Sequence, residues 1–191
     1  MISAREIVYG IYGAYRLCRF DAQGLAYFNA SRQGFWRSFF AAVLIAPAAF
    51  LITAVHSDGV AVQAGPLRIA LIEGLAYVIL VFAYPVAVHP LCRLLDREPN
   101  YITYVIAYNW AGVIQNLLVL PVALLAHSGV LPSALANLAE LAIMGVTLVM
   151  SWYIAKAALR VPSGMAVAFV AVDMVISLVV EWIAEARLGF A

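Results

Sequence analysis

The feature that most constrains this chain is a series of five apolar runs, each separated from the next by a short loop. A helix needs ~20 apolar residues to cross the hydrocarbon core of a bilayer, and every run reaches that length. We therefore predict five transmembrane helices, with residues 1–33 as a separate N-terminal segment. The runs occupy about residues 34–55, 67–91, 101–126, 133–159 and 162–186.

Composition supports a membrane protein and excludes other classes. Hydrophobic residues make up 66% of the 191 residues and charged residues 11%, whereas soluble proteins average roughly half and a quarter. The predicted fold class is therefore all-α, a polytopic integral membrane helical bundle. A formal net charge of +1 excludes a broadly basic nucleic-acid-binding protein. The expected partners are the lipid bilayer and other membrane proteins or further copies of this chain.

Basic residues gather on one side of the predicted bundle, and Arg68 is the exception among the loops of the other side. By the positive-inside rule, the N-terminus is expected in the cytoplasm and the C-terminus outside. The first thirty residues lack the apolar core of a signal peptide, and we expect a bacterial inner (plasma) membrane. The residues that decide the orientation are Arg16, Arg19, Arg32, Arg37, Arg93, Arg97, Lys156 and Arg160.

Residues 3–20 have the pattern of an amphipathic helix. Ser3 and Glu6 have capping-box spacing, and apolar residues then recur at helical intervals. Arg5, Arg16 and Arg19 fall on the polar side of this helix, an arrangement that suits the headgroup layer of an anionic leaflet. We expect the helix to lie in the membrane interface with the three arginines in contact with the surface. The alternative is a cytoplasmic helix packed on the end of the bundle.

The third apolar run is expected at the centre of the bundle, because it is uncharged yet carries three amides that lipid cannot satisfy. Asn109 and Asn116 lie one heptad apart and share a helix face, with Gly112 between them. Gln115 falls on an adjacent seam with two tyrosines. A small residue between amides is typical of close helix packing in a bilayer.

Asp173 is the most informative single residue. It lies eleven positions into the fifth run, roughly 16 Å along a helix and close to the expected membrane midplane. An Asp at that depth costs about 2.5–3.5 kcal/mol unless it is protonated, paired or facing water. Two interpretations remain open: a proton or cation site, or a hydrogen-bonded lock between spans with Asn109 or Asn116 as the donor.

Three glutamates form a second candidate group. Glu73, Glu140 and Glu181 lie at similar depths, within roughly 7–10 Å of the expected outer boundary. Together they would form a shallow acidic vestibule that binds a cation or admits a proton. Alternatively, each reaches the interface on its own.

The sequence contains no motif that indicates catalysis or a bound cofactor. It lacks the nucleophile elbow, the zinc-protease helix, the P-loop and the dinucleotide fingerprint. The histidines have no metal or haem spacing. We expect a protein that is not an enzyme and that uses neither a metal nor a cofactor.

The sequence ASRQGFWRSFF before the first span and the YNW of the third span, together with the expected topology, resemble the Yip1-type membrane domain. The resemblance implies a five-span bundle that binds other membrane proteins or shapes the membrane. No functional residue carries over, because the motif that eukaryotic members place before the first span is absent. The predicted function is an interaction or organising component of the membrane. The alternative is a small proton-coupled or cation-coupled carrier that uses Asp173 and the amide face of the third span.

Overall fold

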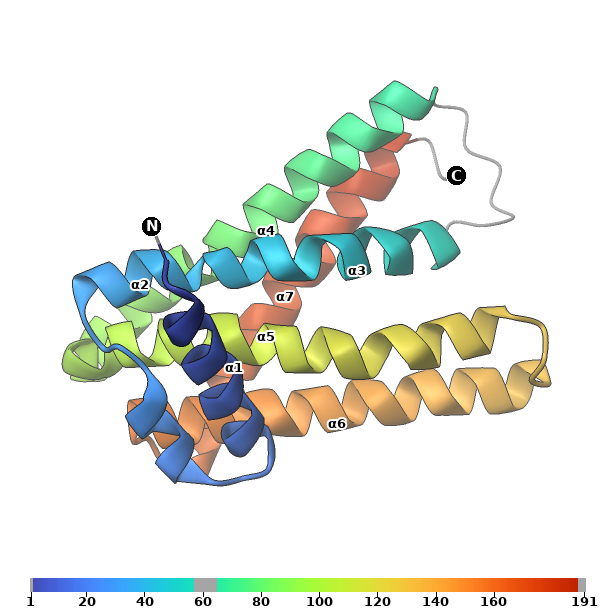
Figure 1. Cartoon of the computed structure of the whole chain (residues 1–191). Helices are drawn as coiled ribbons and strands as arrows, with labels where there is room; N and C mark the ends of the chain where they lie inside the picture. The colour runs from blue at the N-terminus through green and yellow to red at the C-terminus, as the bar shows by residue number, and fades with distance from the viewer. Residues whose placement is uncertain (1, 57–64, 189–191) are drawn as a thin grey trace.

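A computed structural model describes residues 2–56 and 65–188, and this part of the chain folds into seven α-helices and one 3₁₀ helix without strands (Figure 1). The elements are α1 (Ala4–Cys18), η1 (Ala22–Tyr27), α2 (Arg32–Ser38), α3 (Phe40–His56), α4 (Pro66–Leu94), α5 (Glu98–His127), α6 (Ser133–Leu159) and α7 (Ser163–Leu188). The all-α fold and the five membrane-spanning helices are confirmed. The predicted loop over 57–64 and the last three residues lie outside the described residues.

The first apolar run is built from two helices. Ser31 caps α2, since its Oγ accepts a hydrogen bond from the backbone N–H of Gly34 at 3.1 Å. The helical pattern breaks at Phe39, and α3 continues the run to its far end. The first helix of this run therefore begins at Arg32, two residues before the predicted start.

The central position predicted for the third span is confirmed. Helix α5 packs against α6 and α3 along its length, and also contacts α1, α2 and α4. Helix α4 pairs with α7, and the two lean away from the others toward the end of the bundle where α7 ends (Figure 1). We call that end the distal end and the opposite one, where α1 and α2 lie, the N-terminal end.

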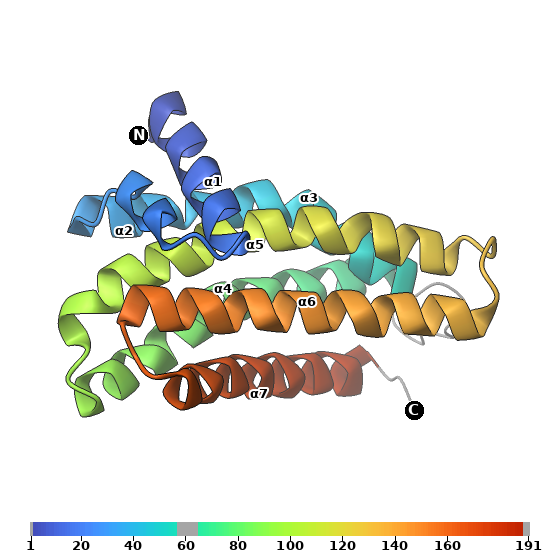
Figure 2. The same cartoon turned by 90° about the horizontal axis from the view of Figure 1, so that it is seen from below.

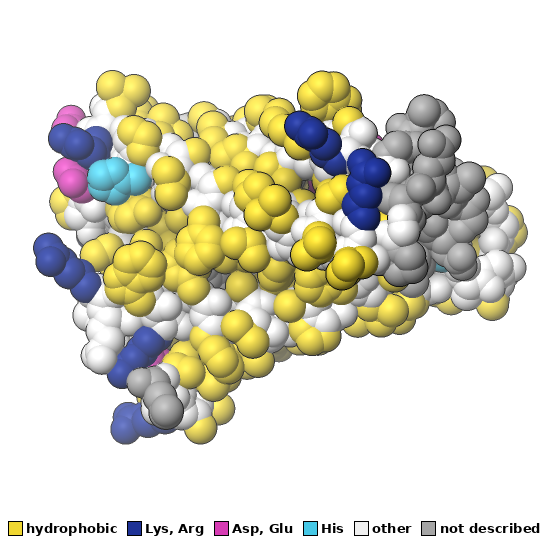
Figure 3. Space-filling view, turned by 90° about the horizontal axis from the view of Figure 1, so that it is seen from above, with side chains coloured by type: hydrophobic (Ala, Val, Ile, Leu, Met, Phe, Trp, Pro, Cys, Tyr) yellow, Lys and Arg dark blue, Asp and Glu magenta, His cyan; other side chains and the backbone are white. Residues whose placement is uncertain are grey.

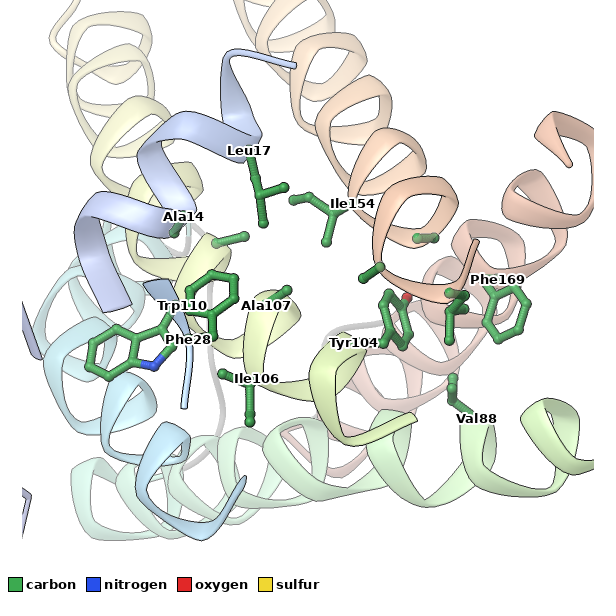
Figure 4. Close-up of a cluster of buried hydrophobic side chains, with 14 of the residues drawn as sticks. Ala14, Leu17, Phe28, Val88, Tyr104, Ile106, Ala107, Trp110, Ile154 and Phe169 are labelled. Carbon is green, nitrogen blue, oxygen red and sulfur yellow. The ribbon is translucent and has the colours of Figure 1, made fainter. Parts of the chain in front are cut away.

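The buried core gathers at the N-terminal end. It draws side chains from α1, the last turns of α4 and α6, the first half of α5 and the first turns of α7 (Figure 4). Toward the distal end, large apolar side chains are exposed instead, as expected where lipid chains replace protein neighbours. Labelled core residues include Ala14, Leu17, Val88, Tyr104, Ile106, Ala107, Trp110, Ile154 and Phe169.

Helix α1 is amphipathic, as predicted. The Oγ of Ser3 accepts a hydrogen bond from the backbone N–H of Glu6 at 3.2 Å and so caps the helix. Its buried face is made largely of small residues and lies on α5 and η1, so that α1 stands against the side of the bundle (Figure 2). Helix α1 therefore packs on the bundle, and its predicted place in the membrane interface stays a prediction.

Candidate functional site

The candidate site is a polar network inside the N-terminal half of the bundle. Its centre is the hydrogen bond that the hydroxyl of Tyr108, on α5, donates to Oδ1 of Asp173, on α7, at 2.8 Å. Both side chains sit among apolar neighbours, where an unpartnered carboxyl group would be costly. The bond therefore ties the last apolar span to the central helix.

Two further tyrosines extend this network to α4. The hydroxyls of Tyr84 and Tyr104 share a hydrogen bond, and the Tyr84 hydroxyl also donates to the carbonyl oxygen of Phe169 at 3.2 Å. The ring of Tyr84 lies 4.6 Å from that of Tyr108, measured between centroids. We define Tyr84, Tyr104, Tyr108 and Asp173 as the tyrosine network. Tyr84 and Tyr104 were not predicted as site residues. The sequence feature that could have indicated them is a hydroxyl group within an apolar run.

The amides of the third span do not reach Asp173. Asn109 donates to Oγ of Ser38, before α3, at 2.9 Å, and Asn116 donates to the carbonyl of Gly112 in its own helix at 3.0 Å. The predicted lock between spans exists, but its donor is Tyr108, and the prediction of Asn109 or Asn116 as the donor was wrong.

Gln115 binds the neighbouring helix α6. Its Nε2 donates to Oγ of Ser151 at 2.9 Å and lies 3.3 Å from the carbonyl oxygen of Thr147. The three predicted amides therefore bond in three different directions. Asn109 and Gln115 tie α5 to different neighbours, Asn116 bonds within α5, and none of the three bonds to Asp173.

The register of the helices places the Tyr108–Asp173 pair level with a basic side chain of α6. Gln115 is level with Thr147 and Ser151, so Tyr108, seven residues earlier in α5, is level with Lys156 of the antiparallel α6. Basic side chains of this kind mark the edge of the hydrocarbon region. The expected depth of Asp173, close to the membrane midplane, stays a prediction.

Two of the three predicted glutamates come together at the distal end. Glu73 and Glu181 are close enough to interact electrostatically, and Glu185 of α7 joins them. Glu140 does not belong to this group, because it pairs with His127 at 3.4 Å. Glu185 was not predicted, although its position four residues after Glu181 places the two side chains on the same side of a helix.

The three predicted surface arginines have different roles. Arg16 turns inward, where its Nε donates to the carboxylate of Asp21 at 2.7 Å and its Nη2 to Gln23 at 2.8 Å. The backbone N–H of Gln23 and the Arg16 guanidinium lower the pKa of Asp21 below its usual value. Arg5 and Arg19 remain on the outer face of α1. Arg16 therefore ties α1 to η1, while its predicted contact with the membrane surface stays a prediction.

Cys18, on the buried face of α1, yields a prediction about reactivity. Burial raises the pKa of its thiol to about 11, which reduces the thiolate fraction at neutral pH about 100-fold relative to an unperturbed thiol. With Cys92 replaced by Ala, we expect maleimide labelling of the folded protein at pH 7.5 to be slower by at least that factor than labelling after denaturation. Equal labelling rates would show that α1 does not stay docked.

Among residues 2–56 and 65–188, five long apolar helices surround this network, and no group of three or more His, Cys, Asp or Glu side chains is placed to hold a metal ion. The five helices are long and apolar enough to cross a membrane, as expected for a multi-pass integral membrane protein. Comparisons with models of known protein families, with curated proteins and with solved structures found no match to this chain. The Yip1-type resemblance therefore stays a prediction.

Proposed function

We propose that this chain is an interaction component of a membrane, whose bundle presents an N-terminal helix to another membrane protein. The observation that carries the proposal is the outer face of α1, which we call the aromatic face. It exposes Val8 at 61% and Tyr9, Tyr12 and Tyr15 at 40–45% of their surfaces. Contiguous exposed apolar side chains on a docked helix are typical of an interaction surface.

The chemistry of the aromatic face suits protein recognition. The guanidinium of Arg5 lies 5.1 Å from the ring centre of Tyr9, and that of Arg19 lies 5.6 Å from the ring centre of Tyr15. Tyr and Arg are the residue types that contribute most to the affinity of protein interfaces. A partner would meet rings and charges that already hold a fixed arrangement.

The position of α1 is fixed before any partner arrives. Arg37 of α2 donates to Glu6 of α1 at 2.8 Å, and Asn29 lies within 3.4 Å of the same carboxylate. Gly10 packs on the ring of Trp110, a buried residue of α5. Such preorganisation supports an interaction role, because binding then costs little conformational entropy.

The carrier alternative receives less support. It requires Asp173 and the amide face of the third span to line one path, whereas Asn109, Gln115 and Asn116 bond to groups other than Asp173. We also propose that the chain lies in an inner membrane with its N-terminus in the cytoplasm. In this orientation the aromatic face lies at the cytoplasmic surface.

Site-specific photo-crosslinking tests the proposal. A photoreactive amino acid at Val8 is expected to give one protein adduct of defined mass in intact membranes, and Val8→Glu is expected to abolish co-purification of the same protein. The matched control is Arg32, an exposed residue of α2, where the photoreactive residue and Arg32→Glu should have neither effect. If position 8 gives only lipid adducts, α1 is an interfacial anchor and the interaction proposal fails.

A further inference from the structure

The paired helices α4 and α7 form an apolar groove at the distal end of the bundle. It encloses about 950 Å³ and is lined by one face of each helix. The apolar side chains along it include Ile72, Leu75, Ile79, Val180 and Ile183. A groove of this character within a membrane accepts hydrocarbon chains.

The mouth of the groove is basic. Arg68, in the first turn of α4, and Arg187, in the last turn of α7, both line it, although they are 119 residues apart in the sequence. All other described Lys and Arg residues lie in or directly after α1, in α2, around the junction of α4 and α5, or at the end of α6. The fold therefore brings together the two basic residues of its distal end. Figure 3 shows dark blue side chains among yellow hydrophobic ones beside the grey residues.

The two arginines are held differently. Nη2 of Arg68 donates to the backbone carbonyl oxygen of Arg187 at 2.7 Å, so that Arg68 caps the C-terminal end of α7. The guanidinium of Arg187 has no hydrogen-bonding or ion-pair partner among the described residues. Arg187 is thus available to an anion at the mouth of the groove.

The nearby glutamates point away from the groove. Glu73 follows the groove residue Ile72 by one position, Glu181 follows Val180, and Glu185 follows Ala184. Adjacent helix positions are turned by about 100° from each other. The carboxylates therefore lie on a different face of the α4 and α7 pair and leave the mouth positive.

From these observations we propose that the groove binds a phospholipid with an anionic headgroup from the distal leaflet. The acyl chains lie along α4 and α7, and the phosphate binds the guanidinium groups of Arg187 and Arg68. Arg binds phosphate through two parallel hydrogen bonds, and charge complementarity favours a headgroup with a net negative charge over a zwitterionic one. The apolar lining selects a molecule with acyl chains over a free anion.

Native mass spectrometry of the full-length protein in mild detergent tests the proposal, with dioleoyl phosphatidylglycerol and dioleoyl phosphatidylcholine as probes. We expect the native protein to retain phosphatidylglycerol at least about 10-fold more tightly than phosphatidylcholine. Arg187→Gln should remove about that preference, which corresponds to roughly 1.4 kcal/mol. The control Arg160→Gln, at the N-terminal end, should retain it.

A second variant keeps the test decisive if the charge change affects folding. Ile72→Trp fills the groove and should weaken retention of both lipids without changing the headgroup preference of the remaining binding. Retention of phosphatidylglycerol by Arg187→Gln and Ile72→Trp at native affinity would overturn the proposal. Competition by 10 mM inorganic phosphate would also overturn it, because a free anion would then be sufficient.

Discussion

Tyr108→Phe is expected to destabilise the bundle by about 1–3 kcal/mol, because it removes the only hydrogen bond that the Asp173 side chain makes among the described residues and leaves a carboxyl group among apolar side chains. Reversible unfolding in mixed micelles, followed by circular dichroism, measures the change. Tyr153→Phe is the control, since that hydroxyl has no hydrogen bond among the described residues; it should have little effect.

A double-mutant cycle separates the bond from other effects of the substitution. Asp173→Leu removes the group that Tyr108→Phe leaves unpartnered, so the double variant should be less destabilised than the sum of the two single variants. Additive effects would show that the two side chains do not interact. Asp173→Asn in liposomes examines the carrier alternative: loss of a measured proton or cation flux with an intact fold would favour a carrier.

Gly10→Ala is expected to undock α1 from the bundle. A Cβ atom at this position would lie 2.8 Å from Nε1 of Trp110 and closer still to its ring carbons, and the ring is buried. We expect a cost of about 1–3 kcal/mol from overpacking. Limited proteolysis should then cut within residues 1–33 at a higher rate, as mass spectrometry of the fragments can show.

The matched control for this substitution is Gly145→Ala, in α6. No atom lies within 4 Å of the position that its Cβ would occupy. Replacing a helical glycine by Ala stabilises the folded protein by about 0.4–1 kcal/mol where the new methyl group has free space. The two variants should therefore change stability in opposite directions, and equal proteolysis of both would contradict the docking of α1 through Gly10.

The helices themselves could be predicted because their signals are local. The length of each apolar run predicted the span count, and Ser3 with Glu6 predicted the start of α1. The break at Phe39 has no comparable signal, since the residues around it are all compatible with a helix. Ser38, next to this break, accepts a hydrogen bond from Asn109 of α5, a long-range contact that the local sequence does not encode.

The partners of the site residues depend on helix rotation, which the sequence does not contain. Tyr108 and Asn109 are adjacent, so their side chains are turned by about 100° from each other. Tyr108 donates a hydrogen bond to Asp173, whereas Asn109 donates one to Ser38. The expected depth of Glu140 was likewise insufficient to predict its partner. Its expected distance from the membrane boundary resembles that of Glu73, but its side chain pairs with His127.

The contact between Gly10 and Trp110 has a consequence for biosynthesis, because the two residues are 100 positions apart. α1 leaves the ribosome before α5, so the surface on which it docks is complete only after the third span has been made. In that interval the bilayer surface is the available partner for its apolar face. The interfacial placement predicted for this helix would then precede its docking on the bundle.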